Sequence, residues 1–272
     1  MVDMPTYRSL LFVPGDRPDR FARALSAGAD AVCLDLEDSV GADRKHEARS
    51  AIRDWLGTAA DRPCAVGARI NGLVGLDVVS DLAALRERPL DFLMVPKVEN
   101  AGDLAQLALT LSGQGLWPII ETPLGLRHAW DIVAAPGVMG ALFGAFDYAA
   151  AADCALEWEP LLFARSQVVA ACAASGVQRL DAPCGDISDL EGLREGARRA
   201  RALGFTGKAC IHPGQIGGVH QAWTPSEADL DFARRALAAF EKSGGASVRL
   251  DGRMVDLPVA LAARRVFSRV GK

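Results

Sequence analysis

Residues 28–40 read GADAVCLDLEDSV, and this stretch contains the pattern that decides the fold. A short apolar run of strand length, residues 31–34, is followed directly by the acidic residues Asp35, Glu37 and Asp38. A segment with helical spacing of apolar residues comes next, at residues 44–55. The order of strand, polar turn and helix is typical of one βα unit in a parallel sheet.

The same order recurs along most of the chain. We predict eight strands, at residues 9–13, 31–34, 65–70, 92–95, 117–120, 138–143, 177–180 and 207–211. Helices are predicted between them, at residues 19–27, 44–55, 76–86, 101–111, 125–134, 161–174 and 188–202. Eight such units imply parallel pairing through right-handed crossovers, and closure into a barrel leaves no free sheet edge. We therefore predict an α/β protein whose residues 1–215 form a (β/α)8 TIM barrel.

A doubly wound open sheet is the competing fold. It is less favoured because the first βα turn, VPGDRPDRF at residues 13–21, is not a Gly-rich dinucleotide loop. The spacing of the eight units also matches that of a barrel.

The pattern changes in the last part of the chain, residues 216–272, which we predict to be a separate extension. A helix is predicted to begin after Ser226 and to end at the paired glycines 244 and 245. A β-hairpin turning at Asp251 and Gly252 follows, and then a helix over residues 258–270. The extension is thus expected to be a helix, a hairpin and a helix.

The composition excludes several classes of protein. Half of the 272 residues are hydrophobic and the formal net charge is −4, which indicates a core-forming chain and argues against disorder and nucleic-acid binding. The six cysteines are scattered without a CxxC pair, so reduced thiols are expected. No signal peptide or long apolar run is seen, so we expect a cytoplasmic protein without membrane contact that binds small molecules.

Polar residues follow nearly every predicted strand, at the end where a TIM barrel carries its chemistry. Glu121 follows the fifth strand and Asp147 the sixth, and their hard carboxylate oxygens suit Mg²⁺ completed by water and substrate. Arg69, at the end of the third strand, is a permanent bidentate donor for a substrate carboxylate or enolate oxygen. Taken alone, Arg69 is also expected to form an ion pair with Glu37 or Asp38. A two-carboxylate magnesium site is the leading hypothesis.

Other polar residues carry weaker signals. Arg17 lies on the first loop, where it is placed to contact an anionic ligand tail such as the phosphates of a nucleotide-like carrier. Lys45 and Arg49, one helical turn apart, are expected to be solvated, and His212 to be structural. No Ser-His-Asp spacing, nucleophile elbow or Walker loop is present. Acyl-enzyme and phosphoryl-transfer chemistry therefore lack a signature in this sequence, and metal-assisted carbon chemistry is the remaining hypothesis.

Eight ordered segments together resemble a known family. They are SLLFVPGDRPDRF, GADAVCLDLEDSV with KHEAR after it, RING, MVPKVE, ETPLG, LFGAFDYAA, GKACIHPGQI and DGRMVDLPV. They resemble the citrate lyase β-subunit-like group, the citryl/malyl/citramalyl-CoA lyases within the HpcH/HpaI aldolase superfamily. The resemblance runs from residue 8 to about residue 266.

The resemblance implies a magnesium-dependent lyase that makes or cleaves a carbon–carbon bond between a CoA thioester and a 2-oxo acid. In this family pattern Glu121 and Asp147 correspond to the metal ligands, and Arg69 to the residue holding the thioester or keto oxygen. Asp256 resembles the catalytic acid that a C-terminal lid delivers to a neighbouring subunit, which implies a homo-oligomer, a trimer or hexamer. Glu37, Asp38 and Lys97 are expected to support the site from behind the residues that touch the substrate, and Glu37 is counted among the catalytic residues. Lys97 and Arg17 are expected on the cofactor side, Arg17 contacting the CoA carrier.

Two departures from the family pattern leave the 2-oxo acid open among glyoxylate, pyruvate and oxaloacetate. Phe146 stands where the family often has an acid, and the segment after Asp147 lacks a usual glycine. Three other functions stay open as well: a class II 2-oxo-acid aldolase on substrates without CoA, a malyl-CoA-type thioesterase, and a non-catalytic subunit of a lyase complex.

Overall fold

The structure is a computed structural model that describes residues 6–58, 62–111 and 113–267. Its internal contacts divide the chain into two compact units, Met1–Val219 and His220–Lys272. None of the described helices is long and apolar enough to cross a membrane.

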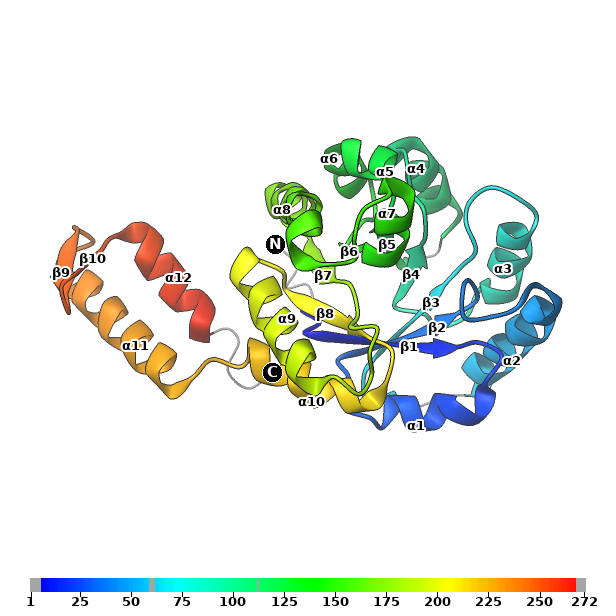
Figure 1. The fold of residues 1–272 in the computed structure, drawn as a ribbon, viewed down its shortest axis with the longest axis horizontal. Coiled ribbons are helices and arrows are strands. Elements are labelled where there is room, and N and C mark those ends of the chain that lie inside the picture. The colour runs from blue at the N-terminus through cyan, green and yellow to red at the C-terminus, as the bar shows by residue number, and fades with distance from the viewer. Residues whose placement is uncertain (1–5, 59–61, 112, 268–272) are drawn as a thin grey trace. The chain divides into compact units, whose positions relative to one another are not determined.

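The first unit is a closed eight-stranded parallel barrel, so the predicted TIM-barrel fold is confirmed and the open-sheet alternative is wrong. Each strand pairs with the next in the chain, and the last pairs with the first through Ser9 and Lys208. Figure 1 shows the helices arranged around the strands of this unit. The strands are β1 (Ser9–Pro14), β2 (Ala31–Asp35), β3 (Ala65–Arg69), β4 (Phe92–Val95), β5 (Gly115–Ile120), β6 (Gly140–Phe143), β7 (Gln178–Asp181) and β8 (Gly207–Cys210).

The helices of the barrel differ from the sequence prediction at three places. The predicted helix 125–134 is broken at His128 into α5 and α6, and α7 and α10 were not predicted. The short α7 begins right after Gly144, so the run FDYAAAA forms a helix of its own before α8. The helices are α1 (Phe21–Leu25), α2 (Lys45–Thr58), α3 (Asp77–Leu85), α4 (Ala101–Thr110), α5 (Pro123–Arg127), α6 (Ala129–Val133), α7 (Ala145–Ala152), α8 (Trp158–Ser175), α9 (Leu190–Leu203) and α10 (Ile216–Trp223).

The interior of the barrel is filled by alternate residues of the strands, as period-two geometry requires. Large rings face glycines across neighbouring strands: a Cβ on Gly67 would overlap the Phe92 ring, and one on Gly140 would overlap Trp117. The buried core cluster is made of Tyr7, Leu10, Ala31, Cys33, Phe92, Met94, Trp117, Ile119, Leu142, Leu180 and Ala209. The same alternation continues toward the carboxyl ends of the strands. Asp35, Arg69 and Glu121 each follow an inward-facing position by two residues, so they also lie on the inward face.

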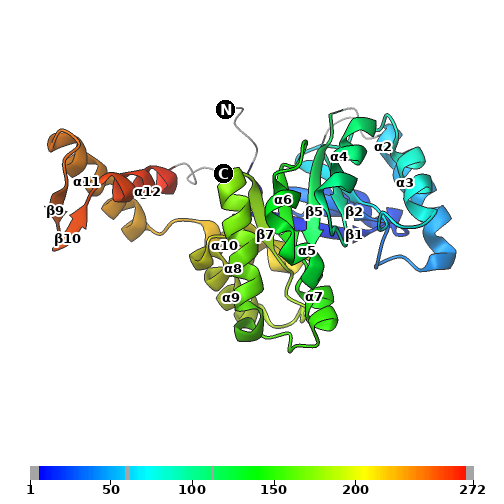
Figure 2. The ribbon, with the colours of Figure 1, turned by 90° about the horizontal axis from the view of Figure 1, so that it is seen from above.

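A charged group is buried on the opposite face of the sheet, against α8. Asp181 and Lys208 alternate with the core residues Leu180 and Ala209, so they point toward the helix layer, where α8 lies beside β7 (Figure 2). Asp181 is fully buried; it accepts hydrogen bonds from Lys208 Nζ at 2.6 Å and from Arg165 Nε at 2.9 Å. Asp181 therefore fastens α8 to the barrel and is not part of its mouth.

Asp181→Asn is expected to destabilise the protein by about 3–5 kcal/mol, because it leaves two buried cations without their anion. Burial alone would raise the pKa of Asp181, but the charges of Lys208 and Arg165 outweigh burial and lower the pKa. The stabilisation is therefore present at neutral pH and is lost as the pH falls through that lowered value, below about 4. Urea unfolding at pH 7 and pH 3 measures both effects; equal stability of the two proteins at pH 7 would contradict the prediction.

The second unit is a helix, a β-hairpin and a helix, as predicted. It contains α11 (Glu227–Lys242), β9 (Val248–Leu250), β10 (Arg253–Val255) and α12 (Leu257–Phe267), and α11 packs on α12. The hairpin turns at Asp251 and Gly252, both with positive φ, and a capping box of Ser226 and Asp229 starts α11. The predicted continuation of the last helix over residues 268–270 lies outside the described residues. The small core of the second unit contains Ala233, Ala236, Val255 and Ala263.

Candidate active site at the mouth of the barrel

Arg69 and Asp35 form a bidentate ion pair across neighbouring strands at the inner rim of the barrel. The ladder places them opposite each other, and Arg69 Nε and Nη2 each lie 2.6 Å from one oxygen of Asp35. Burial would raise the pKa of Asp35, but the hydrogen bonds from Arg69 outweigh it and lower the pKa. The Arg69 guanidinium also lies 5.1 Å from the centre of the Phe12 ring. The orientation of Arg69 is therefore set by Asp35. The sequence had predicted Glu37 or Asp38 as the ion-pair partner of Arg69, and Asp35 was not predicted.

Glu37 and Lys97 extend this ion pair along the rim. Lys97 Nζ donates to Glu37 Oε1 at 2.7 Å, and Arg69 Nη1 lies 2.8 Å from Glu37 Oε2. The contact between Arg69 Nη1 and Glu37 Oε2 is close enough for an ion pair, but its angles do not fit a hydrogen bond. The buried Oε2 of Glu37 therefore has no hydrogen-bond donor. Asp38 is exposed and lies farther out, 3.4 Å from Arg69 Nη1 and 3.8 Å from Lys97 Nζ. Glu37 and Lys97 are thus brought to the site that the sequence predicted for them.

Glu121 and Asp147 both lie close to Lys97. The backbone N–H of Lys97, a residue with positive φ, donates to Glu121 Oε1 at 2.7 Å, while its Nζ lies 3.8 Å from Asp147 Oδ1. Gly144 leaves room for the buried Glu121 carboxylate, because a Cβ there would overlap Oε2 and the side chain's own Cβ. Asp147 lies in the first turn of α7 and is more open to solvent. Both carboxylates are at the same end of the barrel, as the hypothesis required.

This group of side chains has an excess of negative charge. Five carboxylates (Asp35, Glu37, Asp38, Glu121 and Asp147) surround the two cations Arg69 and Lys97, a formal excess of three. Burial, followed by the charges of Asp147 and Glu37, raises the pKa of Glu121 to about 8. A nearby cation would favour the ionised form of such a group.

The residues present fit a divalent cation with oxygen ligands. Glu121 and Asp147 offer hard donors, and the described part of the chain contains no cluster of three or more His, Cys, Asp or Glu set to hold a metal. Two carboxylates with open positions is the arrangement that Mg²⁺ uses when water and substrate complete its shell. A closed structural zinc site would need four protein ligands, so it does not fit.

Lys45 and Asn71 support the acidic loop after β2, a role that the sequence did not predict for either residue. Lys45 is buried and donates to the carbonyls of Leu36 at 2.6 Å and Glu37 at 2.7 Å, so the expectation that it is solvated is wrong. Asn71 Nδ2 also donates to the Leu36 carbonyl, at 3.0 Å. These bonds hold the backbone from which Glu37 projects.

Arg49 is likewise not solvated. It pairs with the buried Asp81 and with Asp77 of α3, and Asp81 in turn accepts from both nitrogens of Asn71. The loop after β2 is therefore tied to α2 and α3.

Lys45→Met is expected to lower the free energy of unfolding by about 2–3 kcal/mol, because the carbonyls of Leu36 and Glu37 each lose a charged donor and keep only a neutral one, from Asn71 and from the N–H of Val40. Turnover should fall as well, because Glu37 loses its support. Arg53→Lys, an exposed change on the same helix, serves as the control. Chemical denaturation and steady-state kinetics measure the two effects; a variant as stable as the control would show that Lys45 supports nothing.

Arg17 is not brought into contact with the carboxylates at the mouth. Its guanidinium forms a bidentate pair with Asp19, at 3.0 and 2.9 Å, and is exposed. A cavity of about 290 Å³ lies nearby, lined on one side by the outward-facing Leu11 and Val13, and Arg20 and Arg23 also line it.

His212 lines the same cavity and has a structural role, as predicted. Its Nδ1 accepts from the N–H of Gly214 at 3.0 Å and caps the short helix that follows β8.

Asp256 belongs to the second unit, where it caps α12. Its Oδ1 accepts from the N–H of Val259 at 3.2 Å. The neighbouring Met254, Leu257 and Leu261 are exposed, with Met254 at 67%. Exposed large apolar side chains thus lie within five residues of Asp256 in this unit.

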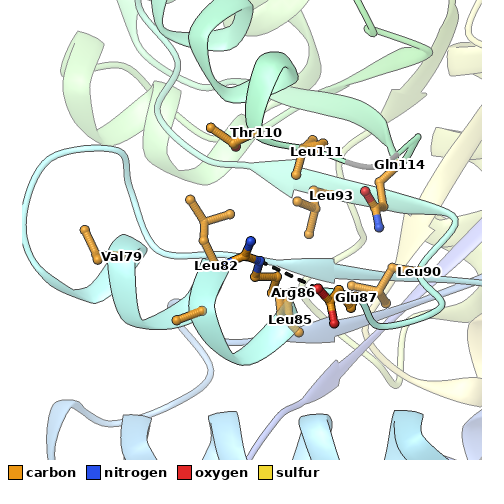
Figure 3. A pocket seen from close by; sticks show the side chains of 11 residues that line it. Val79, Leu82, Leu85, Arg86, Glu87, Leu90, Leu93, Thr110, Leu111 and Gln114 are labelled. Carbon is orange, nitrogen blue, oxygen red and sulfur yellow. Dashed lines mark ion pairs between the residues drawn. The ribbon is translucent and has the colours of Figure 1, made fainter.

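Another cavity, of about 560 Å³, lies far from this chemistry. Figure 3 shows its apolar lining, which includes Val79, Leu82 and Leu93, with the exposed Arg86–Glu87 pair at its edge. It adjoins the end of α3 and the start of β4, which is the amino end of the barrel. Because TIM barrels carry their chemistry at the carboxyl end, this cavity is not the candidate site.

Comparisons with known proteins show relatives over nearly the whole chain. The model of the HpcH/HpaI aldolase/citrate lyase family matches residues 8–213. The citrate lyase subunit beta-like protein of Mycobacterium tuberculosis is 40% identical over 270 residues, covering 96% of this chain and 95% of its own. The (3S)-malyl-CoA thioesterase of Cereibacter sphaeroides is 31% identical over 270 residues, covering 97% and 94%. The crystal structure of protein CitE from M. tuberculosis in complex with magnesium, acetoacetate and coenzyme A superposes with a TM-score of 0.88 at 38% identity, covering 98% of this chain and 99% of that one.

Proposed function

The chain belongs to the HpcH/HpaI aldolase/citrate lyase family, and on that premise we propose that it is a magnesium-dependent CoA-ester lyase. The reaction joins or separates a CoA thioester such as acetyl-CoA and a 2-oxo acid. The observation that carries the proposal is that Glu121 and Asp147 both lie close to Lys97, within the same rim that holds Arg69. The magnesium and coenzyme A bound by the related CitE structure support the same choice.

Glu121 and Asp147 are the residues that would hold the metal. A bound Mg²⁺ supplies Lewis-acid polarisation of the substrate oxygens that reach it. Lys97 keeps Glu121 in place through its backbone N–H. Gly144 provides the space for that carboxylate.

Arg69 stabilises the negative oxygen that develops on the thioester during cleavage. Its charge is permanent: burial alone would lower the pKa of Arg69, but the hydrogen bonds to Asp35 together with the charges of Asp35, Glu37 and Asp38 outweigh burial and raise the pKa. Asp35 holds the guanidinium by two bonds, so no reorganisation is needed when charge develops. Glu37 contributes to catalysis by fixing both Arg69 and Lys97.

Asp256 of another copy of the chain donates the proton that the enolate carbon needs. The exposed Met254, Leu257 and Leu261 beside it are suited to packing on a second protein surface. This role makes the protein a homo-oligomer, a trimer or hexamer, with the second unit as a lid over a neighbouring site.

A mixing experiment tests the lid. Glu121→Ala and Asp256→Asn are each expected to be inactive alone, whereas mixed oligomers, formed by co-expression, should regain about a quarter or more of wild-type turnover. Sites that combine an intact Glu121 with an intact Asp256 then exist only across two chains. Steady-state kinetics of the mixture measures this, with co-expressed Glu121→Ala and Glu121→Gln as the control; no regain would show that Asp256 does not act in trans.

The carrier is placed at the outer rim, where Arg17, Arg20 and Arg23 follow β1. Arg20 and Arg23 line the 290 Å³ cavity there, and guanidinium groups bind phosphates by bidentate hydrogen bonds. Arg17 contributes once its pair with Asp19 is exchanged for a phosphate.

Hydrolysis of a malyl-type CoA ester is the second candidate function. The observation that favours it is the 31% identity with a (3S)-malyl-CoA thioesterase across nearly the whole chain. The same metal and Asp256 would direct water to the thioester carbonyl in place of carbon–carbon cleavage.

One assay separates these functions. Malyl-, citramalyl- and citryl-CoA are incubated with the protein and Mg²⁺, and the products are separated. Acetyl-CoA with a 2-oxo acid identifies the lyase, and free CoA with the intact hydroxy acid identifies the thioesterase. Cleavage of hydroxy-oxo acids without CoA would identify an aldolase, and no turnover of any substrate would indicate a non-catalytic subunit.

A further inference from the structure

We propose that Asp81, a buried residue of α3 in the helix layer, is a positioning residue for the reaction at the barrel mouth. It holds the ends of β2 and β3 together and so keeps Arg69 in the orientation that the developing negative oxygen requires. The inference rests on the proposed function and deepens it, because it names a group that acts on the site without touching the substrate.

The Asp81 carboxylate is fully buried and is oriented by donors on both of its oxygens. Arg49 Nε, from α2, donates to Oδ1 at 2.6 Å. The backbone N–H and the side-chain Nδ2 of Asn71 both donate to Oδ2, at 2.7 Å. Because Arg49 occupies one oxygen, the other is turned toward Asn71. One side chain of the helix layer thus fixes both the backbone and the side chain of Asn71.

Asn71 passes this constraint on to the ends of two strands. Its Nδ2 also donates to the carbonyl of Leu36 at 3.0 Å. The N–H of Leu36 donates in turn to the carbonyl of Arg69 at 2.9 Å. Leu36 directly follows Asp35, which lies opposite Arg69 in the ladder between β2 and β3. Asp81 therefore fixes, through Asn71, the backbone beside this ion pair.

The chain that follows Asn71 is poorly placed to give the same support. Residues 72–76 link Asn71 to α3, and Val74 in this linker is 98% exposed. The buried contact with Asp81 separates the end of β3 from this exposed linker. Loss of the contact is therefore expected to loosen the backbone that carries Arg69.

Arg69 is sensitive to such a change because its guanidinium is held at a fixed place. Nε and Nη2 each lie 2.6 Å from an oxygen of Asp35, so a shift of the backbone breaks one of these bonds or turns the guanidinium. A misplacement of about 1 Å near the chemistry costs on the order of a hundredfold in rate. The loss falls on kcat rather than on KM, because Arg69 acts on charge that appears in the transition state.

Asp81→Asn tests the proposal, with Asp181→Asn as the matched control. The first change turns one accepting oxygen into a donor that faces Arg49 or Asn71. The control makes the same change in a buried carboxylate that also accepts from an arginine, but on β7, four strands away from β3. Both proteins are assayed at a temperature at which circular dichroism shows them folded.

We expect kcat to fall about tenfold to a hundredfold in Asp81→Asn, with KM within about twofold of wild type, and kcat to stay near wild type in Asp181→Asn. Unchanged kcat in Asp81→Asn overturns the proposal, and so does an equal loss in both variants. Asn71→Ala is the milder variant for the case that Asp81→Asn does not fold, because it keeps the backbone N–H and removes only the side-chain link to Leu36. Its kcat should fall about threefold or more, and unchanged kcat there also overturns the proposal.

A double-mutant cycle shows whether Asp81 acts through Arg69. In Arg69→Lys the fixed orientation of the cation is already lost, so adding Asp81→Asn should lower kcat by less than about threefold more. Adding Asp181→Asn serves as the control. If the losses of Asp81→Asn and Arg69→Lys multiply, the two residues act independently and the proposal is wrong.

The NMR signal of Arg69 is a readout that does not depend on turnover. Its Nε–H group is bonded to the buried Asp35, and its ¹H–¹⁵N cross-peak is identified by its absence in Arg69→Lys. The cross-peak should shift or broaden in Asp81→Asn and stay in place in Asp181→Asn; an unchanged cross-peak in Asp81→Asn overturns the proposal. If wild type cleaves none of malyl-, citramalyl- and citryl-CoA, the proposed function is wrong, and the cross-peak still decides whether Asp81 positions Arg69.

Discussion

Glu121→Gln is expected to lower kcat by a factor on the order of 10³ or more while the barrel stays folded. The amide occupies the same space beside Gly144 but removes the negative charge that a divalent ion needs. Lys97 still donates to the side-chain oxygen, so the local structure is kept. Mg²⁺ titration by calorimetry should show weaker binding than in wild type. The melting temperature without metal should stay close to that of wild type at neutral pH, because a carboxyl group whose pKa is raised to about 8 is already largely protonated there.

Glu87→Gln is the control for this change. Its side chain is 83% exposed in the turn after α3, far from the rim, so it removes the same charge without affecting the site. Wild-type turnover of Glu121→Gln at saturating Mg²⁺ would remove the basis of the metal assignment. So would undiminished wild-type turnover after complete chelation of divalent ions.

Arg69→Lys is expected to lower kcat/KM by a factor on the order of 10² to 10³ although the charge is kept. Lysine is a point charge and cannot bind Asp35 with two parallel bonds, so the cation loses its fixed orientation. The loss should fall mainly on kcat, because an oxyanion donor acts in the transition state. Steady-state kinetics with a malyl-type thioester separates kcat from KM.

The free energy of unfolding is measured on the same variant, because the buried Asp35 loses at least one of its two hydrogen bonds when lysine replaces Arg69. Arg53→Lys, whose arginine is half-exposed and paired with Asp54, is the matched control and should behave like wild type. An Arg69→Lys protein with unchanged kcat would show that Arg69 is only a structural ion-pair partner.

Much of this architecture could be predicted from local sequence. Most strands of the barrel are short apolar runs between turns, such as residues 31–34. The structure then shows that alternate residues of these runs, such as Ala31 and Cys33, fill the core. Glu121 and Asp147 could be selected because they follow such runs, and all parallel strands end at one face. The helix, hairpin and helix of the last unit followed from a Ser226 cap and an Asp251–Gly252 turn, both of which are local signals.

The partners of the site residues could not be predicted in this way. Asp35 is the last residue of an apolar strand, and only the register with β3 shows that it faces Arg69. Lys45 looks like an ordinary surface lysine of a helix, and its burial depends on where the loop after β2 folds back. The helix α7, which carries Asp147, is too short and too rich in alanine to show a helical period.

The sequence by itself determined the barrel, its extension and the residue types at the rim, because hydrophobic period and turn chemistry act over a few neighbouring residues. Only the tertiary structure decided that Asp181 and Lys208 face the helix layer. It also decided that, at the mouth of the barrel, Asp35 pairs with Arg69 and Glu37 pairs with Lys97. The physical reason is that an ion pair depends on a distance of a few ångströms between two side chains. Barrel closure and strand register set these distances between residues far apart in the sequence, such as Glu37 and Lys97, which are 60 positions apart.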